Sequence, residues 1–370
     1  TIGGNEPGQK ALFPSQLISG LPKSFESARL SIAAVEPIYV TLLGVGSPPT
    51  YEDVQIGAAP AQVTKAAASK LDQLSANWEM RITTQSNTCG FENGDPSTET
   101  LRLVWCNQQF TIIPASGLWG MGVVDGDRIA FSGMEVDIED ESCPMVLHSN
   151  GMGLIAESRI DGTISTSVSA EAAGCGDFSD CVIDAEVTME KLYDSQCFER
   201  AYFEMNPANS DYVLPYPTGK AYRLNQTYCG PTSGHHNQLA FDFLIPIGDE
   251  VVAARSGVVR ALREDSPDDG QGSRHNHVMI EHTDGTVGFY AHLKQAGVLV
   301  GVDDDVTAGQ LIAYAGHSGT TDVPHLHFGV YQDYPPIEGQ DVPITFRNAP
   351  GPIDCRGGLI PGETYQAVTD

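Results

Sequence analysis

Short segments of alternating apolar and polar residues occupy the chain between about residues 81 and 186. Clusters of Gly, Asp, Asn and Ser separate these segments, as turn residues separate the strands of an antiparallel sheet. A period of two places alternate side chains on one face of a strand, where they can form a core. The pattern predicts a β-rich domain with strands that include Leu101–Trp105, Phe110–Ile113, Arg128–Phe131 and Gly162–Val168.

Ahead of these segments, the spacing of apolar residues changes to three and four. From Ala61 to Met80 this spacing predicts a helix whose apolar face carries Val63, Ala67, Leu71, Leu74 and Trp78. Pro60 stands just before it, in a position that suits the first turn of a helix. We also expect one or two strands between Ser31 and Val45 and a short helix within Val187–Phe203. Residues 1–30, rich in Gly, Pro and Ser, are expected to form a loosely held lead-in.

The chain is long enough for two domains, because its 370 residues exceed the size at which a single hydrophobic core stops growing. The Pro-containing stretch 206–219 is the best candidate for the boundary. We therefore predict a mainly β protein. Its parts are a mostly β N-terminal domain at 1–205 with one or two helices, a second domain at 206–345, and a C-terminal tail at 346–370.

The chain is strongly acidic, with 48 acidic and 20 basic residues and a formal net charge of −28. Nucleic-acid phosphates repel such a chain, so we expect no nucleic-acid partner. No run of eighteen or more apolar residues occurs, which argues against membrane insertion. The oligomeric state is left open.

The eight cysteines include no C-x-x-C pair, which favours disulfides in an oxidising compartment over a zinc finger. The sequence allows 105 pairings. The least costly closures join near neighbours, Cys175 with Cys181 or Cys89 with Cys106. Cys229 and Cys355 bracket the last third of the chain and could tie the C-terminal tail back onto it.

Asp242 stands among Ala240, Phe241 and Phe243, in what should be a buried strand. An unpaired carboxylate there would cost several kcal/mol, so Asp242 needs a cation or strong hydrogen-bond donors. A metal ion would meet that need. The structural alternative is that Asp242 caps the turn at 246–248.

Two histidines, His325 and His327, stand two residues apart in the segment 324–328. On a strand they would share one face, separated by about 6.5–7 Å, so one could bind a metal while the other reaches water or substrate. The alternative is a solvated strand face. His292 ends a second expected strand and shares a face with Tyr290, after the tight turn at Asp284–Gly285.

Two histidines and one aspartate form a ligand set that leaves one coordination position of a zinc ion open for water. Zinc lowers the pKa of such a water and polarises a carbonyl group. Two further histidines could then act as acid, base or oxyanion donor. Neither an H-E-x-x-H helix nor a G-x-S-x-G turn is present.

Taken together, these motifs resemble the lysostaphin-like zinc metalloendopeptidase family, whose members cleave peptidoglycan cross-links and Gly-rich peptides. The family pattern is His…Asp before a P-x-G-x-x-V turn, then Y-x-H, then G-x-S-G followed by P-H-L-H. The match covers about residues 225–332, through the segments Asp242–Val251, Tyr290–Leu293, Gly316–Thr320 and Pro324–Phe328.

The resemblance implies an antiparallel β-sheet peptidase domain with its site in a groove between loops. It also implies a role for each matched residue. The Zn²⁺ ligands would be Asp242, His327 and either His235 or His236; the catalytic histidines would be His292 and His325; and the substrate-binding residues would be Tyr290, His317 and Ser318. Of the two candidate first ligands, His235 follows a glycine as in some family variants, whereas His236 has the even spacing to Asp242 that a continuous strand favours.

The function expected on these grounds is that of a secreted enzyme, extracellular or periplasmic. It would hydrolyse peptide bonds in peptidoglycan or Gly-rich peptides with a metal-activated water. A non-catalytic peptide- or glycan-binding protein on the same fold is the alternative, although the complete ligand set favours an enzyme. A zinc-binding signalling or adhesion protein would not need His292 and His325. The N-terminal domain could recognise substrate, block the groove or stabilise the enzyme.

Overall fold

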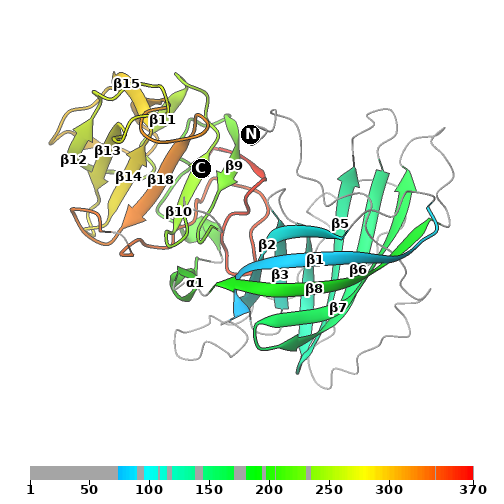
Figure 1. The fold of residues 1–370 in the computed structure, drawn as a ribbon. Helices are drawn as coiled ribbons and strands as arrows, with labels where there is room; N and C mark the ends of the chain where they lie inside the picture. The colour runs from blue at the N-terminus through cyan, green and yellow to red at the C-terminus, as the bar shows by residue number, and fades with distance from the viewer. Residues whose placement is uncertain are drawn as a thin grey trace.

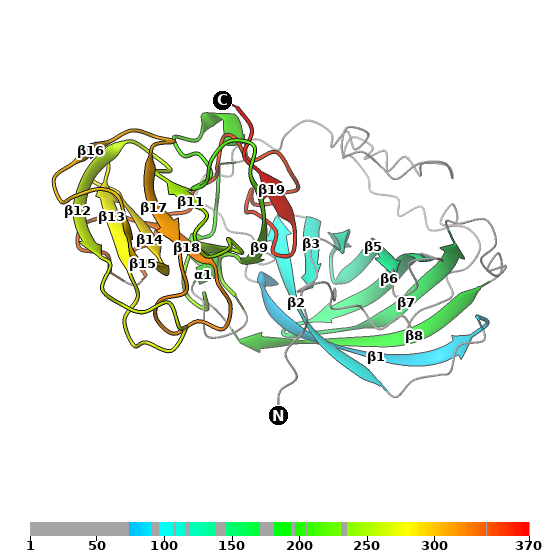
Figure 2. The same cartoon turned by 90° about the horizontal axis from the view of Figure 1, so that it is seen from above.

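The computed structural model describes residues 74–89, 96–106, 109–114, 119–137, 145–170, 181–193, 197–204, 206–230, 235–337 and 339–369. These residues form a closed β-barrel and, beside it, a unit built on two sheets (Figure 1 and Figure 2). The mainly β fold class is confirmed. The strands expected between Ser31 and Val45 and the lead-in at 1–30 lie outside the described residues.

Eight antiparallel strands close the barrel, each paired with the next and the last paired with the first. Along the first strand, Trp78, Met80 and Ile82 are buried while Glu79 and Arg81 are exposed, which is the alternation that a strand with one inner face requires. Aromatic side chains fill part of the interior. The strands are β1 (Ala76–Asn87), β2 (Ser97–Cys106), β3 (Gln109–Pro114), β4 (Gly120–Asp125), β5 (Arg128–Asp137), β6 (Met145–Ala156), β7 (Arg159–Ala170) and β8 (Val182–Tyr193).

The second unit contains one eight-stranded and one three-stranded antiparallel sheet. Buried side chains of both sheets form one core. The large sheet has the order β16 (Asp305–Val306), β12 (Gly257–Arg263), β13 (His277–Glu281), β14 (Val287–Ala291), β18 (Leu326–Tyr331), β10 (Ala240–Phe243), β9 (Ala221–Gln226) and β19 (Thr364–Gln366). The small sheet has the order β11 (Glu250–Val252), β17 (Leu311–Ala315) and β15 (Leu293–Val298).

The outer face of β2 and β3 packs against the second unit. The C-terminal segment lies at this contact between the barrel and the second unit (Figure 2). Arg102 of β2 is buried, and its guanidinium carbon lies 4.9 Å from the centre of the Tyr228 ring. From the C-terminal segment, Arg356 donates to the carbonyl of Trp105 at 3.0 Å and to that of Phe198 at 2.6 Å. These buried contacts join the two units.

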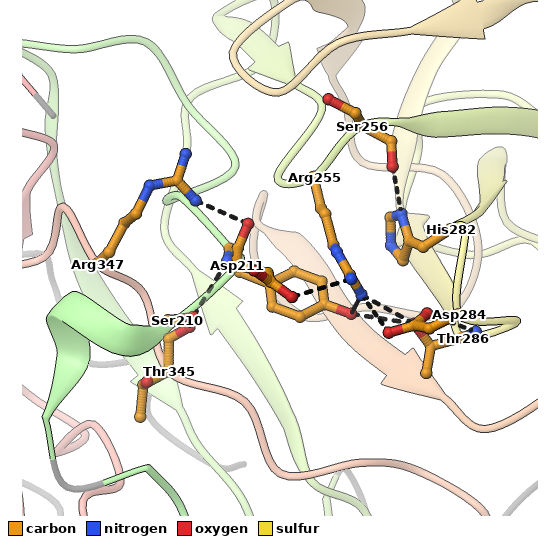
Figure 3. A network of polar contacts seen from close by, with 10 residues as sticks. Ser210, Asp211, Arg255, Ser256, His282, Asp284, Thr286, Thr345 and Arg347 are labelled. Carbon is orange, nitrogen blue, oxygen red and sulfur yellow. Dashed lines mark hydrogen bonds and ion pairs between the residues drawn. The ribbon is translucent and has the colours of Figure 1, made fainter.

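Arg255 ties the chain ahead of β9 to the turn between β13 and β14 (Figure 3). Its guanidinium lies 2.9 Å from an Asp211 carboxylate oxygen and 2.7 Å from an Asp284 oxygen. His282 lies beside this network, with its Nδ1 donating to the Ser256 carbonyl at 2.9 Å.

The helix predicted from Ala61 to Met80 is wrong where the structure describes it, because residues 76–80 belong to strand β1. Residues 61–73 lie outside the described residues. In the segment predicted to hold a short helix, Val187 to Tyr193 continues strand β8, and the helix α1 (Cys197–Arg200) has four residues. The four strands predicted by alternation are confirmed within β2, β3, β5 and β7.

Three disulfides occur among the described residues, and the shortest of them in sequence, Cys197 with Cys229, spans 32 residues. Cys89 pairs with Cys181 and not with Cys106, so that closure was wrong, as was the one between Cys175 and Cys181. The suggested Cys229–Cys355 link is also wrong, because Cys355 pairs with Cys106 of β2 and Cys229 pairs with Cys197 ahead of β9. Cys355 therefore holds the C-terminal segment to the barrel.

Within the described residues, no helix has the length and apolar character needed to cross a membrane.

Candidate active site

Asp242 and His327 lie directly opposite each other on the neighbouring antiparallel strands β10 and β18. Residues paired in this way place their side chains on the same face of a sheet, about 4.5–5.5 Å apart at Cβ. The Asp242 Oδ1 accordingly lies 3.0 Å from His327 Nδ1. Asp242 is only 3% exposed, so this contact is shielded from bulk water.

His235 reaches the same point from a turn ahead of β10 and is 1% exposed. The N–H of Gly230 donates to the His235 carbonyl at 2.9 Å, which folds the turn back onto the end of β9. The His235 Nδ1 donates to the Thr227 carbonyl at 3.1 Å, and the opposite ring nitrogen, Nε2, is thereby directed at Asp242 and His327. His236 is exposed. Of the two candidate first ligands, the structure therefore brings His235 to the aspartate.

The three donor atoms form a nearly equilateral triangle. His235 Nε2 lies 3.1 Å from His327 Nδ1 and 3.1 Å from Asp242 Oδ1, and the third edge is 3.0 Å. Three ligands at the corners of a tetrahedral zinc ion with metal–ligand distances near 2 Å are about 3.3 Å apart. The triangle thus matches three corners of such a site, and among the described residues these three, called here the candidate metal-binding group, could hold a metal ion.

The charge distribution also fits a cation. Burial opposes ionisation of Asp242, but the charges of His235 and His327 and their hydrogen bonds hold its pKa well below the usual value. Burial lowers the pKa of His327 despite its hydrogen bond to Asp242, which favours the neutral ring that a metal ligand must have. The hydrogen bond from His235 to Thr227 fixes the tautomer whose Nε2 carries the lone pair, as such bonds do for metal-bound imidazoles. Burial opposes the charged form of His235, but the charge of Asp242 and the hydrogen bonds to Asp242 and Thr227 together outweigh it and raise the pKa of His235.

His292 follows the last residue of β14 and adopts a φ of 61°, a conformation that residues other than glycine rarely take. Its Nδ1 donates to the Ser318 carbonyl at 2.7 Å, and its ring centre lies 6.1 Å from that of His327. Burial, followed by the charge of His325, lowers the pKa of His292 to about 3. The ring is therefore neutral near pH 7, with Nε2 able to accept a proton.

His325 lies against His292, with ring centres 4.5 Å apart and an angle of 54° between the ring planes. Its Nδ1 contacts the Val323 carbonyl at 2.9 Å and the Thr321 hydroxyl at 3.0 Å, while Nε2 lies 3.6 Å from Asp242 Oδ1. His327 lies in β18 and His325 immediately precedes that strand, and both side chains point to Asp242, as alternation along an extended segment requires.

The three residues expected to bind substrate have different surroundings. Tyr290 is fully buried on the other face of the sheet, where its hydroxyl accepts a hydrogen bond from the Ala254 N–H at 2.7 Å. Ser318 is also fully buried, and its hydroxyl donates to the Leu293 carbonyl at 2.7 Å. As placed here, neither side chain can contact a substrate. His317 is half-buried, and its Nε2 contacts the Thr321 carbonyl within the same loop at 3.0 Å.

Sequence reasoning missed Asn276, whose hydrogen bonds hold together the loops that carry the site residues. Asn276 is fully buried, and its side chain bonds to both the N–H and the carbonyl of Ser266 and to the Leu293 carbonyl. Its backbone N–H donates to the Ser318 hydroxyl at 2.9 Å. A lone asparagine carries no motif, and only the tertiary contacts reveal this role.

Residues 236–340 match the sequence profile of "Peptidase family M23". The peptidoglycan DD-endopeptidase ShyB of Vibrio cholerae is 34% identical over 139 residues, which cover 35% of this chain and 30% of that protein. The peptidoglycan DD-endopeptidase ShyA of the same organism is 31% identical over 121 residues, which cover 30% of this chain and 26% of that protein. The match therefore spans less than a third of the length of either relative.

Among solved structures, the catalytic domain of lysostaphin from Staphylococcus simulans is similar, at 30% identity. The similarity covers 31% of this chain and 80% of that domain, with a TM-score of 0.23. The profile match and the two curated relatives place residues 236–340 in peptidase family M23, the lysostaphin-like metallopeptidases that the sequence motifs predicted.

Proposed function

We propose that this chain is a secreted zinc-dependent metalloendopeptidase that hydrolyses peptide bonds in peptidoglycan cross-links, with Gly-rich peptides as the second substrate class. The M23 domain supports a hydrolase, and the names of two relatives support peptidoglycan as the substrate. The disulfides support an extracellular or periplasmic location. We further propose that 206–345 is the catalytic domain.

One observation carries the proposal. His235, Asp242 and His327 converge from a turn and two strands with their donor atoms 3.0–3.1 Å apart, and two more imidazoles stand beside them. A structural ion pair would not need His292 and His325 at this place. Structural zinc sites usually have four protein ligands, whereas three leave a position for water or substrate.

The proposed roles follow from the free ring nitrogens. A zinc ion bound by His235, Asp242 and His327 would lower the pKa of water and polarise the scissile carbonyl. His292 is the general base, because its Nδ1 is held by the Ser318 carbonyl and its Nε2 can accept a proton from the attacking water. His325 has its Nδ1 held in the same way by the Val323 carbonyl, so it would present an N–H donor to the developing oxyanion once its Nε2 has taken up a proton.

The test combines metal analysis of the purified chain with digestion of purified peptidoglycan and of a pentaglycine peptide. We expect about one zinc per chain, cleavage of peptidoglycan, and loss of cleavage after chelation that added zinc restores. Cleavage of pentaglycine alone would move the substrate class to Gly-rich peptides. Zinc binding with retention of peptidoglycan but without any cleavage would contradict an enzyme and favour a binding protein.

Three variants separate metal binding from catalysis. His327→Ala should lose both zinc and turnover, because it removes one of three ligands. His292→Ala and His325→Ala should retain zinc and lose turnover by at least a hundredfold, as the loss of a proton-transfer group predicts. His236→Ala is the matched control, since His236 is exposed beside His235, and it should behave as the wild type.

A further inference from the structure

His275 is an imidazole near the candidate metal-binding group that the roles proposed above do not use. It precedes strand β13 and is half-buried. Its ring centre lies 5.7 Å from that of His292 and 5.6 Å from that of Phe289. The Phe289 ring in turn lies 6.0 Å from His327. His292 therefore has a ring contact with His325 and a second ring contact with His275.

The position of His275 is fixed by its neighbour in the chain. Asn276 is hydrogen-bonded to Ser266, Leu293 and Ser318, and these contacts join the loop ahead of β13 to the segments that follow His292 and His317. The N–H of Leu293 also donates to the Asn276 carbonyl at 3.2 Å. The backbone of His275 is thus held to the same frame as the catalytic histidine.

Gly319 allows this close approach. A Cβ atom at Gly319 would lie 2.9 Å from the Cβ of His275, closer than side chains tolerate. Gly319 also has a φ of 87°, which favours glycine. The last glycine of the G-x-S-G motif therefore makes room for a side chain that the motif itself does not contain.

The chemistry of His275 suits a peptide. In the part of the chain that the structure describes, neither ring nitrogen is engaged in a hydrogen bond, whereas the rings of His292 and His325 are both anchored. Burial, followed by the charge of His277, lowers the pKa of His275 to about 4, so the ring is neutral near pH 7. A neutral imidazole has one donor and one acceptor, which match the carbonyl and N–H of an amide better than a carboxylate.

We propose that His275 binds the substrate by hydrogen-bonding a backbone amide of the peptide beside His292. This inference rests on the proposed function and deepens it. It assigns to the loop ahead of β13 a direct part in holding the peptide, next to the residue that removes the proton.

The experiment uses the full chain, loaded with zinc, and a cross-linked muropeptide dimer purified from peptidoglycan. His275→Ala should raise KM about tenfold, the effect of one lost hydrogen bond, while kcat changes less than twofold. His275→Asn keeps a donor and an acceptor and should recover part of the loss. His148→Ala is the matched control, because His148 is exposed on the barrel strand β6, and its kinetics should equal the wild type.

Two further measurements keep the outcomes apart. Zinc content and the thermal midpoint of His275→Ala should equal those of the wild type, and a fall in either would assign His275 a structural role instead. An unchanged KM, or a fall in kcat alone, would overturn the inference while the enzyme remains active. If the wild type does not cleave the dimer, the proposed function fails. Calorimetric affinity for the uncleaved dimer then decides separately whether His275 binds it.

Discussion

The side-chain amide of Asn77 donates to the carbonyl of Cys229 at 3.0 Å, across the contact between the barrel and the second unit. Asn77 is 1% exposed and belongs to β1 of the barrel. Cys229 has a φ of 53°, an uncommon conformation for a residue other than glycine, and its N–H donates at 3.0 Å to the carbonyl of Gln238, three residues after His235. The barrel thus contributes directly to the support of a proposed metal ligand.

We expect Asn77→Ala to weaken zinc binding about tenfold, because residues that orient metal ligands have effects of this size. The free energy of unfolding should fall by about 1–3 kcal/mol, since the buried Cys229 carbonyl loses its donor. A competition titration with a zinc chelator and urea unfolding measure the two effects. Asn150→Ala, on a half-exposed position of β6, is the control. Unchanged zinc affinity in Asn77→Ala would show that the barrel does not support the site.

The disulfide between Cys197 and Cys229 should have the same consequence for the metal. The double variant Cys197→Ser/Cys229→Ser should lose at least tenfold in zinc affinity, because it frees the turn that holds His235. Its matched control is Cys89→Ser/Cys181→Ser, which removes a disulfide between β-barrel segments. Both variants should lose about 2–4 kcal/mol of stability, but only the first should lose zinc. Equal zinc affinity in the two would contradict this expectation.

Ser318→Ala should act on stability and on His292 more than on substrate affinity. The Ser318 hydroxyl bridges the Asn276 N–H and the Leu293 carbonyl inside the protein. Its loss should lower the free energy of unfolding by about 1–3 kcal/mol and reduce kcat, because the Ser318 carbonyl orients His292. Ser132→Ala, at an exposed position of β5, should be neutral. An increase in KM with full stability would restore the direct role in substrate binding that the motif indicated.

His282 should make stability depend on pH in weakly acidic solution. Burial lowers the pKa of His282, against the opposing hydrogen bond to the Ser256 carbonyl, and the charge of Arg255 acts with burial (Figure 3). The unfolded chain therefore binds this proton near pH 6.5, where the folded chain does not. The contribution of neutral His282 to the free energy of unfolding is complete above pH 6.5. It is lost as the pH falls from there towards the lowered pKa of His282 in the folded chain.

Urea unfolding between pH 5 and pH 8 tests this expectation. The free energy of unfolding of His282→Gln should decline less steeply below pH 6.5 than that of the wild type, by at most about 1.4 kcal/mol per pH unit, which corresponds to one proton. The exposed His148, replaced by Gln, is the control and should keep the wild-type slope. Parallel slopes for His282→Gln and the wild type would exclude a role of His282 in this dependence.

The geometry of the site could be anticipated because short-range rules govern most of it. His325 and His327 share a face by strand alternation, and Asp242 had to meet a cation or donors in its apolar surroundings. The choice between His235 and His236 could not be made, because it depends on the contacts of Gly230 and Thr227 with His235. Those contacts form only when the turn folds back on β9.

The errors have equally specific causes. Leu74 and Trp78 are four residues apart, a spacing that fits one face of a helix and also one face of a strand, so periodicity alone could not decide. Cysteine pairing depends on how the barrel packs against the C-terminal segment, which no local pattern contains. For Tyr290 the motif indicated substrate binding. In the structure Ala291 is paired with His327, so the preceding residue, Tyr290, points to the opposite face of the sheet.

The closed barrel also affects how the molecule meets other copies of itself. Closure satisfies the backbone hydrogen bonds along β1 and β8, the two strands that would otherwise be open to pairing with a foreign chain. The edge strands of the large sheet in the second unit are β16 and β19, which have two and three residues. Edges this short offer little template for intermolecular strand addition. The barrel and the large sheet therefore resist aggregation through the addition of foreign strands.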